Sequence, residues 1–398
     1  MNLLTQATLI CIALLGFLSF CYSDNRSWGG LPDNLNGKAI SMNSKASSTL
    51  FDEDTSPWVE QVGKKPRAFL FHNFLTPAER SHIVKVAAPQ MRRSTVSGPH
   101  GESVVDDIRT SYGTFLNRLS DPIIEAVQRR ISLWTQLPMD HQEDMQVLRY
   151  SINQTYRAHL DSGNHKGEPG PQFRLATFLL YLSDVEEGGE TAFPSGHSEW
   201  YDESQERAAH IAAAEGKISD CAKGNVAVKP RAGNGILFYS FHPNGTMDHN
   251  ALHAGCPVIR GIKWSAPIWI HHDPFRPEEF ERKLKQRSTL QTNGESTLSK
   301  MRKADPGMCM DFHKSCNEWA SNGECKNNAP FMVGSNFAIG ECRLSCGTCE
   351  ICSPSDYTCR NRNRAKQGYL ILDPKEMSWL GAESVFENSY KTDESSEL

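Results

Sequence analysis

The sequence lacks several features that would point to other classes of protein. Its 398 residues contain no long basic run, and 47 acidic residues outnumber 42 basic ones to give a net charge of -5, which makes nucleic acid a poor partner. It contains no internal repeat, so a repeat architecture is not expected. Its apolar run at residues 7–20 is shorter than the ~20 residues that a membrane span needs. The length suits one large or two ordinary globular domains.

The N-terminus has the pattern of a targeting signal. The apolar run is followed by Cys21-Tyr22-Ser23, with small residues at the spacing that a signal peptidase prefers. We expect residues 1–23 to be a cleaved signal peptide, with a type II signal anchor as the alternative. Either would bring the protein to the endoplasmic reticulum, in the lumen or as a single-pass membrane protein. The sequons at Asn25, Asn153 and Asn244 are glycosylation candidates there.

Composition and hydrophobic patterning divide the rest of the chain into a large catalytic region and a small cysteine-rich module. Residues 24–57 are rich in Ser, Asn, Asp and Gly, and residues 350–398 are polar and acidic without a core pattern. The expected parts are a linker (24–57), a helical and strand support (58–141), a β-rich core (142–273), a second linker (274–308), the cysteine module (309–349) and a C-terminal tail (350–398).

Local signals predict two helices and a set of short strands. Thr76-Pro77-Ala78-Glu79 combines an N-cap, a proline at the first helical position and a capping-box glutamate, and Ser120-Asp121-Pro122 starts a second helix in the same way. Short β-rich runs separated by turn signals follow, and they predict a mainly β protein with flanking helices, a sandwich or barrel of which the jelly roll (double-stranded β-helix) is one form. One strand is predicted before the first helix, at 67–72, and the later predicted strands are 147–150, 156–159, 175–182, 226–228, 236–241 and 263–271, with an exposed insertion at 195–220.

A candidate metal site is carried by two separate stretches of the chain. His159 and Asp161 lie at i and i+2, which puts both side chains on one face of an extended strand. His253 adds a second imidazole. Two histidines and one carboxylate with open positions form the facial triad of non-haem Fe(II) oxygenases. A lone His-X-Asp is a weak signal, because a strand histidine usually just satisfies a hydrogen bond.

Lys263 makes the metal hypothesis more specific. A lysine that points into a barrel is costly unless it meets an anion, and a dicarboxylate that chelates iron at one end needs a cation at the other. The alternative is a solvent-facing lysine on an edge strand. Alternation puts Lys263, Ser265, Trp269 and His271 on one face of their strand and an apolar set on the other, although Pro267 could introduce a bulge.

Several stretches together resemble the secretory-pathway prolyl 4-hydroxylases, particularly the plant and algal type. The resemblance covers about residues 57–273. It rests on Arg109–Leu116, Tyr150–Asp161, Arg174–Asp184, Gly188–Phe193 and His253–His271.

The resemblance implies a procollagen-proline 4-dioxygenase type of enzyme that uses Fe(II), 2-oxoglutarate, O2 and ascorbate and acts on proline-rich polypeptides. It implies His159, Asp161 and His253 as iron ligands and Lys263 as the partner of the distal carboxylate of 2-oxoglutarate. Tyr150 and Thr191 match positions that help to hold this cosubstrate, and four residues match positions near the peptide or the reacting centre: Tyr156, Arg174, Trp269 and His271.

Alternatives to these roles stay open. Tyr150 and Trp269 could be core aromatics, Thr191 an ordinary strand residue, and Arg174 a surface salt-bridge partner. Many relatives carry glycine at the position of Asn153 and an aromatic at that of Ser162, which concerns peptide preference more than activity. Other functions considered are hydroxylation of another side chain, such as lysine, and an inactive protein that binds proline-rich peptides.

The cysteines indicate an oxidising compartment, since seven of the 12 lie between Cys309 and Cys352. Cys221 and Cys256 form a disulfide or remain free and buried. Six cysteines in the module allow 15 pairings, and a Cys-X-X-Cys could also bind zinc, although the secretory signal disfavours that. The pattern resembles the ShK-toxin-like (ShKT) domain, which implies the pairs Cys309–Cys349, Cys316–Cys342 and Cys325–Cys346 and leaves Cys352 and Cys359 to each other.

Overall fold

A computed structural model describes most of the chain beyond residue 55, and the described residues lie in one compact unit. The described ranges are 56–97, 103–162, 173–195, 219–292, 305–335 and 338–378. The proposed signal sequence, Asn25 and most of the 195–220 insertion lie outside them. No helix among the described residues combines the length and hydropathy needed to cross a membrane.

Both predicted helices begin at the expected caps. In α2 (Pro77–Ala87), the Thr76 hydroxyl accepts a hydrogen bond from the Glu79 backbone N–H, and the Glu79 carboxylate accepts one from the Thr76 backbone N–H. In α3 (Pro122–Thr135), the Asp121 carboxylate accepts bonds from the backbone N–H groups of residues 123 and 124. Each cap satisfies N–H groups that have no partner inside the helix.

Two antiparallel sheets form the β part of the molecule, as the mainly β prediction requires. The large sheet has the order β1-β2-β13-β9-β16-β7-β6-β3, and the small one has the order β12-β11-β14-β8. The strands of the large sheet are β1 (Trp58–Gly63), β2 (Ala68–His72), β3 (Arg92–Arg93), β6 (Tyr112–Leu116), β7 (Met145–Tyr150), β9 (Arg174–Tyr181), β13 (Gly235–Tyr239) and β16 (Lys263–His271). Those of the small sheet are β8 (Tyr156–His159), β11 (Thr191–Phe193), β12 (Val226–Val228) and β14 (His253–Gly255).

Two further pairs complete the strands: β4 (Val96–Ser97) with β5 (Ser103–Val104), and β10 (Glu187–Gly188) with β15 (Val258–Arg260). All seven predicted strands are present, and three of them have the expected bounds: β8, β12 and β16. The missed strands are mostly two or three residues long, which is too short for an alternating pattern to show.

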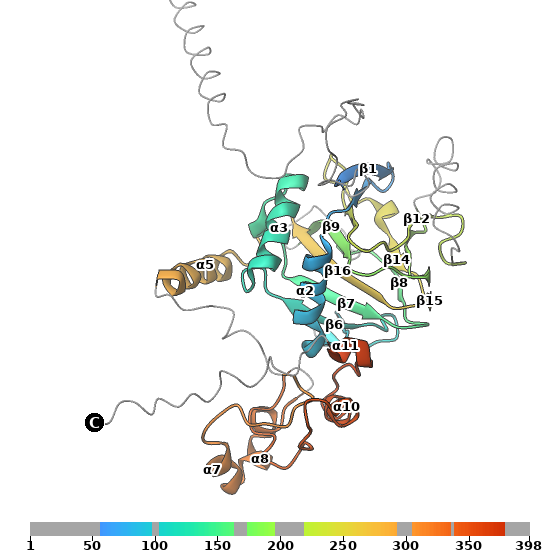
Figure 1. The fold of residues 1–398 in the computed structure, drawn as a ribbon. Coiled ribbons are helices and arrows are strands. Elements are labelled where there is room, and N and C mark those ends of the chain that lie inside the picture. Colours follow the sequence, from blue (N-terminus) through green and yellow to red (C-terminus); the bar gives the residue numbers. More distant parts are fainter. Residues whose placement is uncertain are drawn as a thin grey trace, which may run out of the picture. The chain divides into compact units, whose positions relative to one another are not determined.

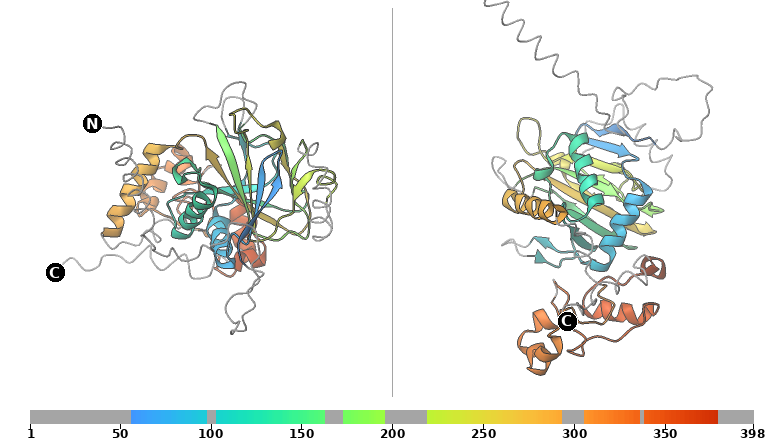
Figure 2. Two further views of the ribbon diagram at one scale, coloured as in Figure 1. Left: turned by 90° about the horizontal axis from the view of Figure 1, so that it is seen from above. Right: turned by 60° about the vertical axis from the view of Figure 1, so that its left-hand side comes forward.

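The main core lies between the large sheet and the two helices (Figures 1 and 2). Ile83 and Val84 of α2 and Ile124, Val127 and Ile131 of α3 belong to the same buried cluster as alternate residues of β16. Those residues of β16 are Trp264, Ala266, Ile268 and Ile270. The helices therefore cover the apolar face of β16, and the opposite face of this strand is left for a site.

The C-terminal part of the chain differs from the expectation. The second linker contains α5 (Pro277–Thr292), and the cysteine module contains α7 (Cys316–Ser321), α8 (Glu324–Asn327) and α9 (Ala329–Met332). The segment expected to be a tail forms α10 (Tyr357–Lys366) and α11 (Pro374–Ser378), and its Leu370, Leu372 and Met377 are buried in the main core. The expectation of a tail without core residues was therefore wrong for this segment, because its only cue is one short apolar run, Tyr369–Leu372, in a polar stretch.

We call residues 357–378 the clasp, because polar contacts also hold them to the catalytic region. Arg364 donates to the carbonyls of Ala88 and Pro89 just beyond α2, and the Leu370 N–H donates to the Met91 carbonyl. Glu376 forms a buried ion pair with Arg149 of β7, with Nε and Oε1 2.6 Å apart. The clasp is thus part of the catalytic unit.

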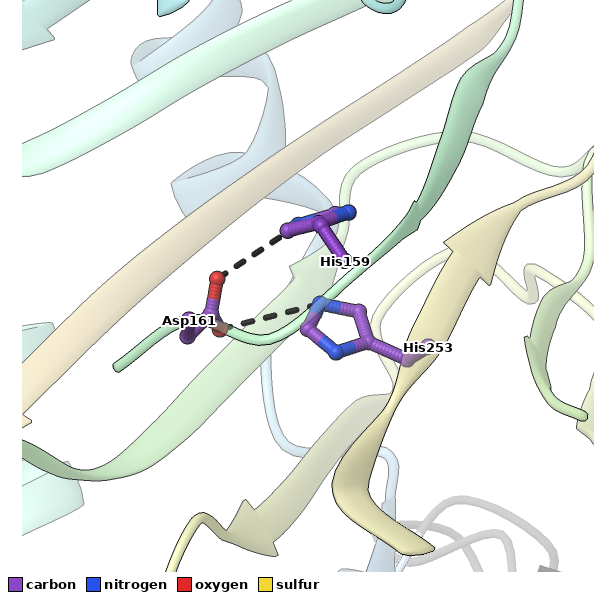
Figure 3. Close-up of side chains that lie close together, drawn as sticks. All are labelled: His159, Asp161 and His253. Carbon is purple, nitrogen blue, oxygen red and sulfur yellow. Dashed lines mark ion pairs between the residues drawn. The ribbon is translucent and has the colours of Figure 1, made fainter. Parts of the chain in front are cut away.

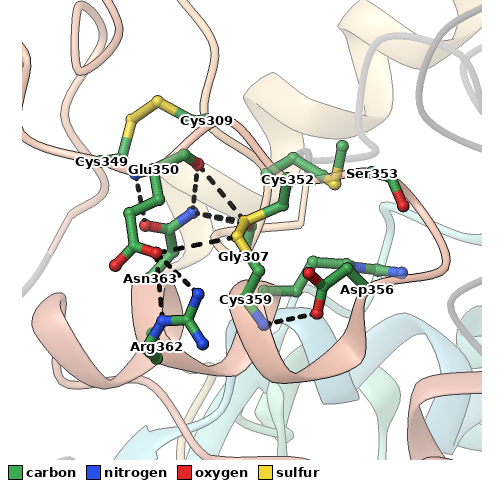
Figure 4. Close-up of a disulfide and its surroundings, with 12 residues drawn as sticks. Gly307, Cys309, Cys349, Glu350, Cys352, Ser353, Asp356, Cys359, Arg362 and Asn363 are labelled. Carbon is green, nitrogen blue, oxygen red and sulfur yellow. Dashed lines mark hydrogen bonds and ion pairs between the residues drawn. A yellow bond between two sulfur atoms is a disulfide. The ribbon is translucent and has the colours of Figure 1, made fainter.

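The disulfides agree with the predicted pairing. The ShKT-like pairs Cys309–Cys349, Cys316–Cys342 and Cys325–Cys346 are all present, and so are Cys221–Cys256 and Cys352–Cys359. Figure 4 shows Cys352 and Cys359 beside Asn363, which donates from α10 to the Glu350 carbonyl. A zinc site at the Cys-X-X-Cys pairs is excluded in this structure, because each of these sulfurs is already bonded to another.

Candidate metal and cosubstrate site

The small sheet brings the three predicted metal ligands together. β8 and β14 are antiparallel neighbours in which His159 lies opposite His253, and Asp161 follows β8. The His159 Nε2 atom lies 3.5 Å from Asp161 Oδ1, and the His253 Nε2 atom lies 3.7 Å from Asp161 Oδ2 (Figure 3). One ligand atom from each residue lies within 4.8 Å of the others, and no second group of this kind occurs among the described residues.

Hydrogen bonds orient the ligands toward a common point. The Nδ1 atoms of His159 and His253 lie 2.8 and 3.0 Å from the backbone carbonyls of Arg157 and Ala251. Since a carbonyl only accepts, each neutral ring carries its proton on Nδ1 and leaves the Nε2 lone pair free for a metal. The Thr177 hydroxyl donates to Asp161 Oδ2. This donor set fits a divalent iron ion with open positions.

The electrostatics of the triad also suit a metal. Burial raises the pKa of Asp161, but the nearby His253 and His159 lower it by more, so the pKa of this carboxyl lies well below its usual value. Burial lowers the pKa of His253 to about 4, although the charge of Asp161 opposes this change. At neutral pH both groups are therefore in their metal-binding forms, a carboxylate and a neutral imidazole.

Lys263 lies in the same cavity as the triad. The cavity has an empty volume of about 470 Å³, including its open mouth, and its walls include His159, Asp161, His253 and Lys263. The Lys263 side chain is only 3% exposed, and its ammonium donates to the Gly189 carbonyl at 2.6 Å. It makes no ion pair with the described residues. Lys263 is therefore not a solvent-facing edge lysine, and it offers a cation to an anion in the cavity.

The residues around Lys263 form a polar end of the cavity. Tyr150 lies opposite Lys263 on β7, with its ring centre 5.6 Å from Nζ. The Thr191 hydroxyl accepts a hydrogen bond from the Tyr181 hydroxyl at 2.8 Å, and Thr191 lines the cavity. Burial lowers the pKa of Lys263 to about 8, so the amine is still mostly protonated at neutral pH. Tyr150 and Thr191 thus lie where an anion held by Lys263 would contact them.

The predicted alternation along β16 is confirmed. Lys263, Ser265 and Trp269 line the cavity, whereas the alternate residues are buried in the core. Pro267 causes no break in the register, and the irregularity occurs instead between Ile270 and His271. His271 does not line the cavity; its Nε2 atom lies 2.8 Å from Glu143 Oε1.

Aromatic and cationic side chains form a wall beside the triad. The Tyr156 ring stacks on His159 at 3.6 Å between centres, and the Arg109 guanidinium lies 4.8 Å from the Tyr156 ring centre. The Arg174 guanidinium lies 3.8 Å from the Trp269 ring centre. The structure therefore brings Tyr156, Arg174 and Trp269 close to the triad, as expected of residues on the substrate side.

Two residues of this region were missed as site candidates. Glu143 accepts hydrogen bonds from Arg174 at 2.6 Å and lies beside His271, so it joins two of the predicted residues. It lies in a short connection without a pattern, and the sequence carries no signal for it. Arg109 begins one of the family-like stretches and could have been selected on that basis, since it is buried and lines the cavity.

Comparisons with known proteins agree with this site. Residues 145–271 match the model of the 2OG-Fe(II) oxygenase superfamily, and residues 308–349 match the ShK domain-like model. The chain is 40% identical over 308 residues to a probable prolyl 4-hydroxylase 4 from Arabidopsis thaliana, covering 76% of this chain and 92% of the relative. It is 41% identical over 293 residues to prolyl 4-hydroxylase 2 of the same plant, covering 73% and 88%.

Among solved structures, a viral collagen prolyl hydroxylase from Paramecium Bursaria Chlorella virus-1, in a 2OG complex, aligns with 24% identity and a TM-score of 0.38, over 53% of this chain and 97% of that one. The family is shown by the plant relatives, which are matched over most of their length. The chain therefore belongs to the prolyl 4-hydroxylase family of 2-oxoglutarate- and iron-dependent dioxygenases.

Proposed function

We propose that this protein hydroxylates peptidyl proline to 4-hydroxyproline, coupled to decarboxylation of 2-oxoglutarate to succinate. The observation that carries the proposal is a buried lysine that forms no ion pair with the described residues, in the same cavity as a His-Asp-His triad. The plant relatives named above support the choice of proline.

Each residue of the cavity has a distinct role in this proposal. His159, Asp161 and His253 would hold Fe(II), which 2-oxoglutarate would chelate and which would supply the activation of O2. Lys263 pairs with the distal carboxylate of the cosubstrate, and Thr191 and Tyr150 contact it. The Thr177 hydroxyl fixes the Asp161 carboxylate, and the low pKa of this carboxyl keeps it ionised. Ascorbate maintains the ferrous state.

The substrate-side wall suits a proline-rich chain. Such chains adopt an extended polyproline II helix that docks on aromatic grooves, and Tyr156 and Trp269 present aromatic surface beside the triad. Arg109 and Arg174 cover the two rings and could donate to peptide carbonyls. Glu143 holds Arg174 and His271 in place.

The same wall disfavours the alternative that the enzyme hydroxylates lysine side chains. A lysine side chain would need an acidic partner near the triad, and Glu143 is already occupied by Arg174 and His271. The buried Lys263 disfavours the third alternative, an inactive peptide-binding protein, because burying a cation is costly without an anionic ligand. We further propose that the protein works in the endoplasmic reticulum, a location supported by five disulfides that need an oxidising compartment.

The direct test is an assay of succinate release with Fe(II), 2-oxoglutarate and ascorbate, on a proline-rich peptide and on a matched peptide with lysine in place of proline. Mass spectrometry of the product identifies the hydroxylated residue. His159→Ala should abolish turnover, whereas the matched control His249→Ala, at an exposed histidine, should not. Peptide binding without turnover by the wild type would favour the binding protein, and hydroxylation of the lysine peptide alone would favour the lysyl enzyme.

A further inference from the structure

Arg118 is a buried cation that lies outside the cavity of the triad. Its side chain is buried, it does not belong to the residues that line the cavity, and it lies in the connection between β6 and α3. Burying a guanidinium is unfavourable unless hydrogen-bond acceptors replace the water that it loses. The acceptors around Arg118 therefore indicate which parts of the chain it holds in place.

The Arg118 guanidinium is bonded to backbone carbonyls of two separate segments. Its Nη1 atom donates to the carbonyls of Met139 at 3.3 Å, of Asp140 at 3.0 Å, and of Gln142. Its Nη2 atom donates to the Phe275 carbonyl at 2.7 Å. The first three carbonyls belong to the connection between α3 and β7, and the fourth lies just beyond β16. The guanidinium thus ties the chain that enters β7 to the chain that leaves β16.

Both segments carry residues of the proposed substrate side. Glu143 directly follows Gln142. The Phe275 ring stacks on the His271 ring, with centres 4.7 Å apart. Glu143 and His271 meet each other, with Oε1 and Nε2 2.8 Å apart. Arg118 therefore holds a direct neighbour of each member of this pair.

The backbone around Glu143 is fixed from both sides. The Asp144 carboxylate, which follows it, accepts from the Arg118 backbone N–H at 3.1 Å and from the Asn117 side chain at 3.0 Å. The Glu143 N–H itself donates to the Trp269 carbonyl at 2.8 Å. Since Arg118 bonds to the residues immediately before and after Glu143, the position of the Glu143 carboxylate depends on Arg118.

We propose that Arg118 is a positioning residue for the peptide, because its guanidinium holds Glu143 and His271 against each other. Glu143 in turn orients Arg174 beside the Trp269 ring. The inference rests on the proposed function, in which this side of the cavity meets the proline-rich chain. Arg118 contacts neither the metal ligands nor the cosubstrate end of the cavity, so its loss should affect the peptide and not 2-oxoglutarate.

The test compares the kinetics for a proline-rich peptide with the binding of 2-oxoglutarate, both measured on the full chain. Arg118→Met keeps most of the length of the side chain and removes its donors. We expect kcat/KM for the peptide to fall roughly 10- to 100-fold, mainly through a higher KM, because displaced positioning groups lower rates by such factors. The dissociation constant of 2-oxoglutarate, from calorimetry with Mn(II) under argon, should stay unchanged.

A cycle of single and double variants separates positioning from general destabilisation. If Arg118 acts through Glu143, Arg118→Met should have little further effect on peptide kcat/KM once Glu143→Gln is present. The matched control is Arg130→Met, since Arg130 also holds a backbone carbonyl, that of Phe74 at 2.8 Å, and pairs with Glu79 at 2.6 Å. This control should lower the stability to urea but leave the peptide KM unchanged.

Three results would overturn the proposal: a normal peptide KM in Arg118→Met, fully independent effects of Arg118→Met and Glu143→Gln, or an equal rise of KM in Arg130→Met. The last two would mean a structural role only. If Arg118→Met does not fold, Arg118→Lys replaces it. Lysine keeps the charge but offers one nitrogen in place of two separate donor atoms, so the peptide KM should still rise, and a normal KM overturns the proposal. Wild-type protein that turns over no proline-rich peptide would instead refute the proposed function itself.

Discussion

The buried ion pair between the clasp and the catalytic region gives a prediction whose size can be worked out. The Arg149 and Glu376 side chains are 7% and 2% exposed, and two bonds of 2.6 and 3.1 Å join them. Glu376→Gln keeps the volume but leaves the guanidinium without a counter-charge. Leaving one member of a buried pair uncompensated costs about 3–5 kcal/mol. Because the amide oxygen can still accept one bond, we expect a loss near ~3 kcal/mol in the free energy of unfolding.

Urea unfolding with the disulfides intact, followed by tryptophan fluorescence, measures this loss. The matched control is Glu186→Gln, which breaks an ion pair at the surface with 67% and 61% exposed partners and should cost no more than ~1 kcal/mol. The double variant Arg149→Met and Glu376→Leu removes both charges and should recover most of the stability. A loss below ~1 kcal/mol for Glu376→Gln would refute the view that the clasp is part of the catalytic unit.

Four further predictions concern the site and the core. Lys263→Met should weaken 2-oxoglutarate binding roughly 10- to 150-fold, since a charge-assisted contact contributes ~1.5–3 kcal/mol, while Mn(II) affinity measured by calorimetry stays unchanged. In the wild type, kcat/KM for 2-oxoglutarate should fall above about pH 8, where Lys263 loses its proton; a flat profile to pH 9.5 would contradict this assignment. Thr177→Val removes the donor to Asp161 and should lower metal affinity ~10- to 100-fold, measurable by competition with a chelator. Leu372→Ala should cost ~2–5 kcal/mol in urea unfolding, and a cost under ~1 kcal/mol would mean that this buried side chain contributes little to the core.

The residues that could be predicted from the sequence are those with a fixed spacing. His159 and Asp161 share a strand face because the strand period is two, and the same period put Lys263 and Trp269 on one face of β16. The capping residues Thr76 and Asp121 could also be predicted from the sequence, because a helix start depends on contacts over three residues.

The residues that could not be predicted act through contacts between distant parts of the chain. Glu143 lies 31 residues before Arg174 in sequence, and Glu376 lies 227 residues after Arg149, so no local period relates either pair. Leu370 and Leu372 joined the core, although only the four-residue apolar run Tyr369–Leu372 marks them in an otherwise polar segment. Burial of such residues depends on tertiary packing, which local patterns do not report.

The clasp also links oxidation of the cysteine module to completion of the catalytic core. Residues 357–378 come far later in the sequence than Met91 and Arg149, so during synthesis the surface around those two residues is covered only after the clasp has been made. Docking must close a long loop, and the entropy of loop closure grows with the length of free chain. The four disulfides within residues 309–359 shorten that free chain. Oxidative folding of the small module should therefore lower the entropic cost of assembling the enzyme's core.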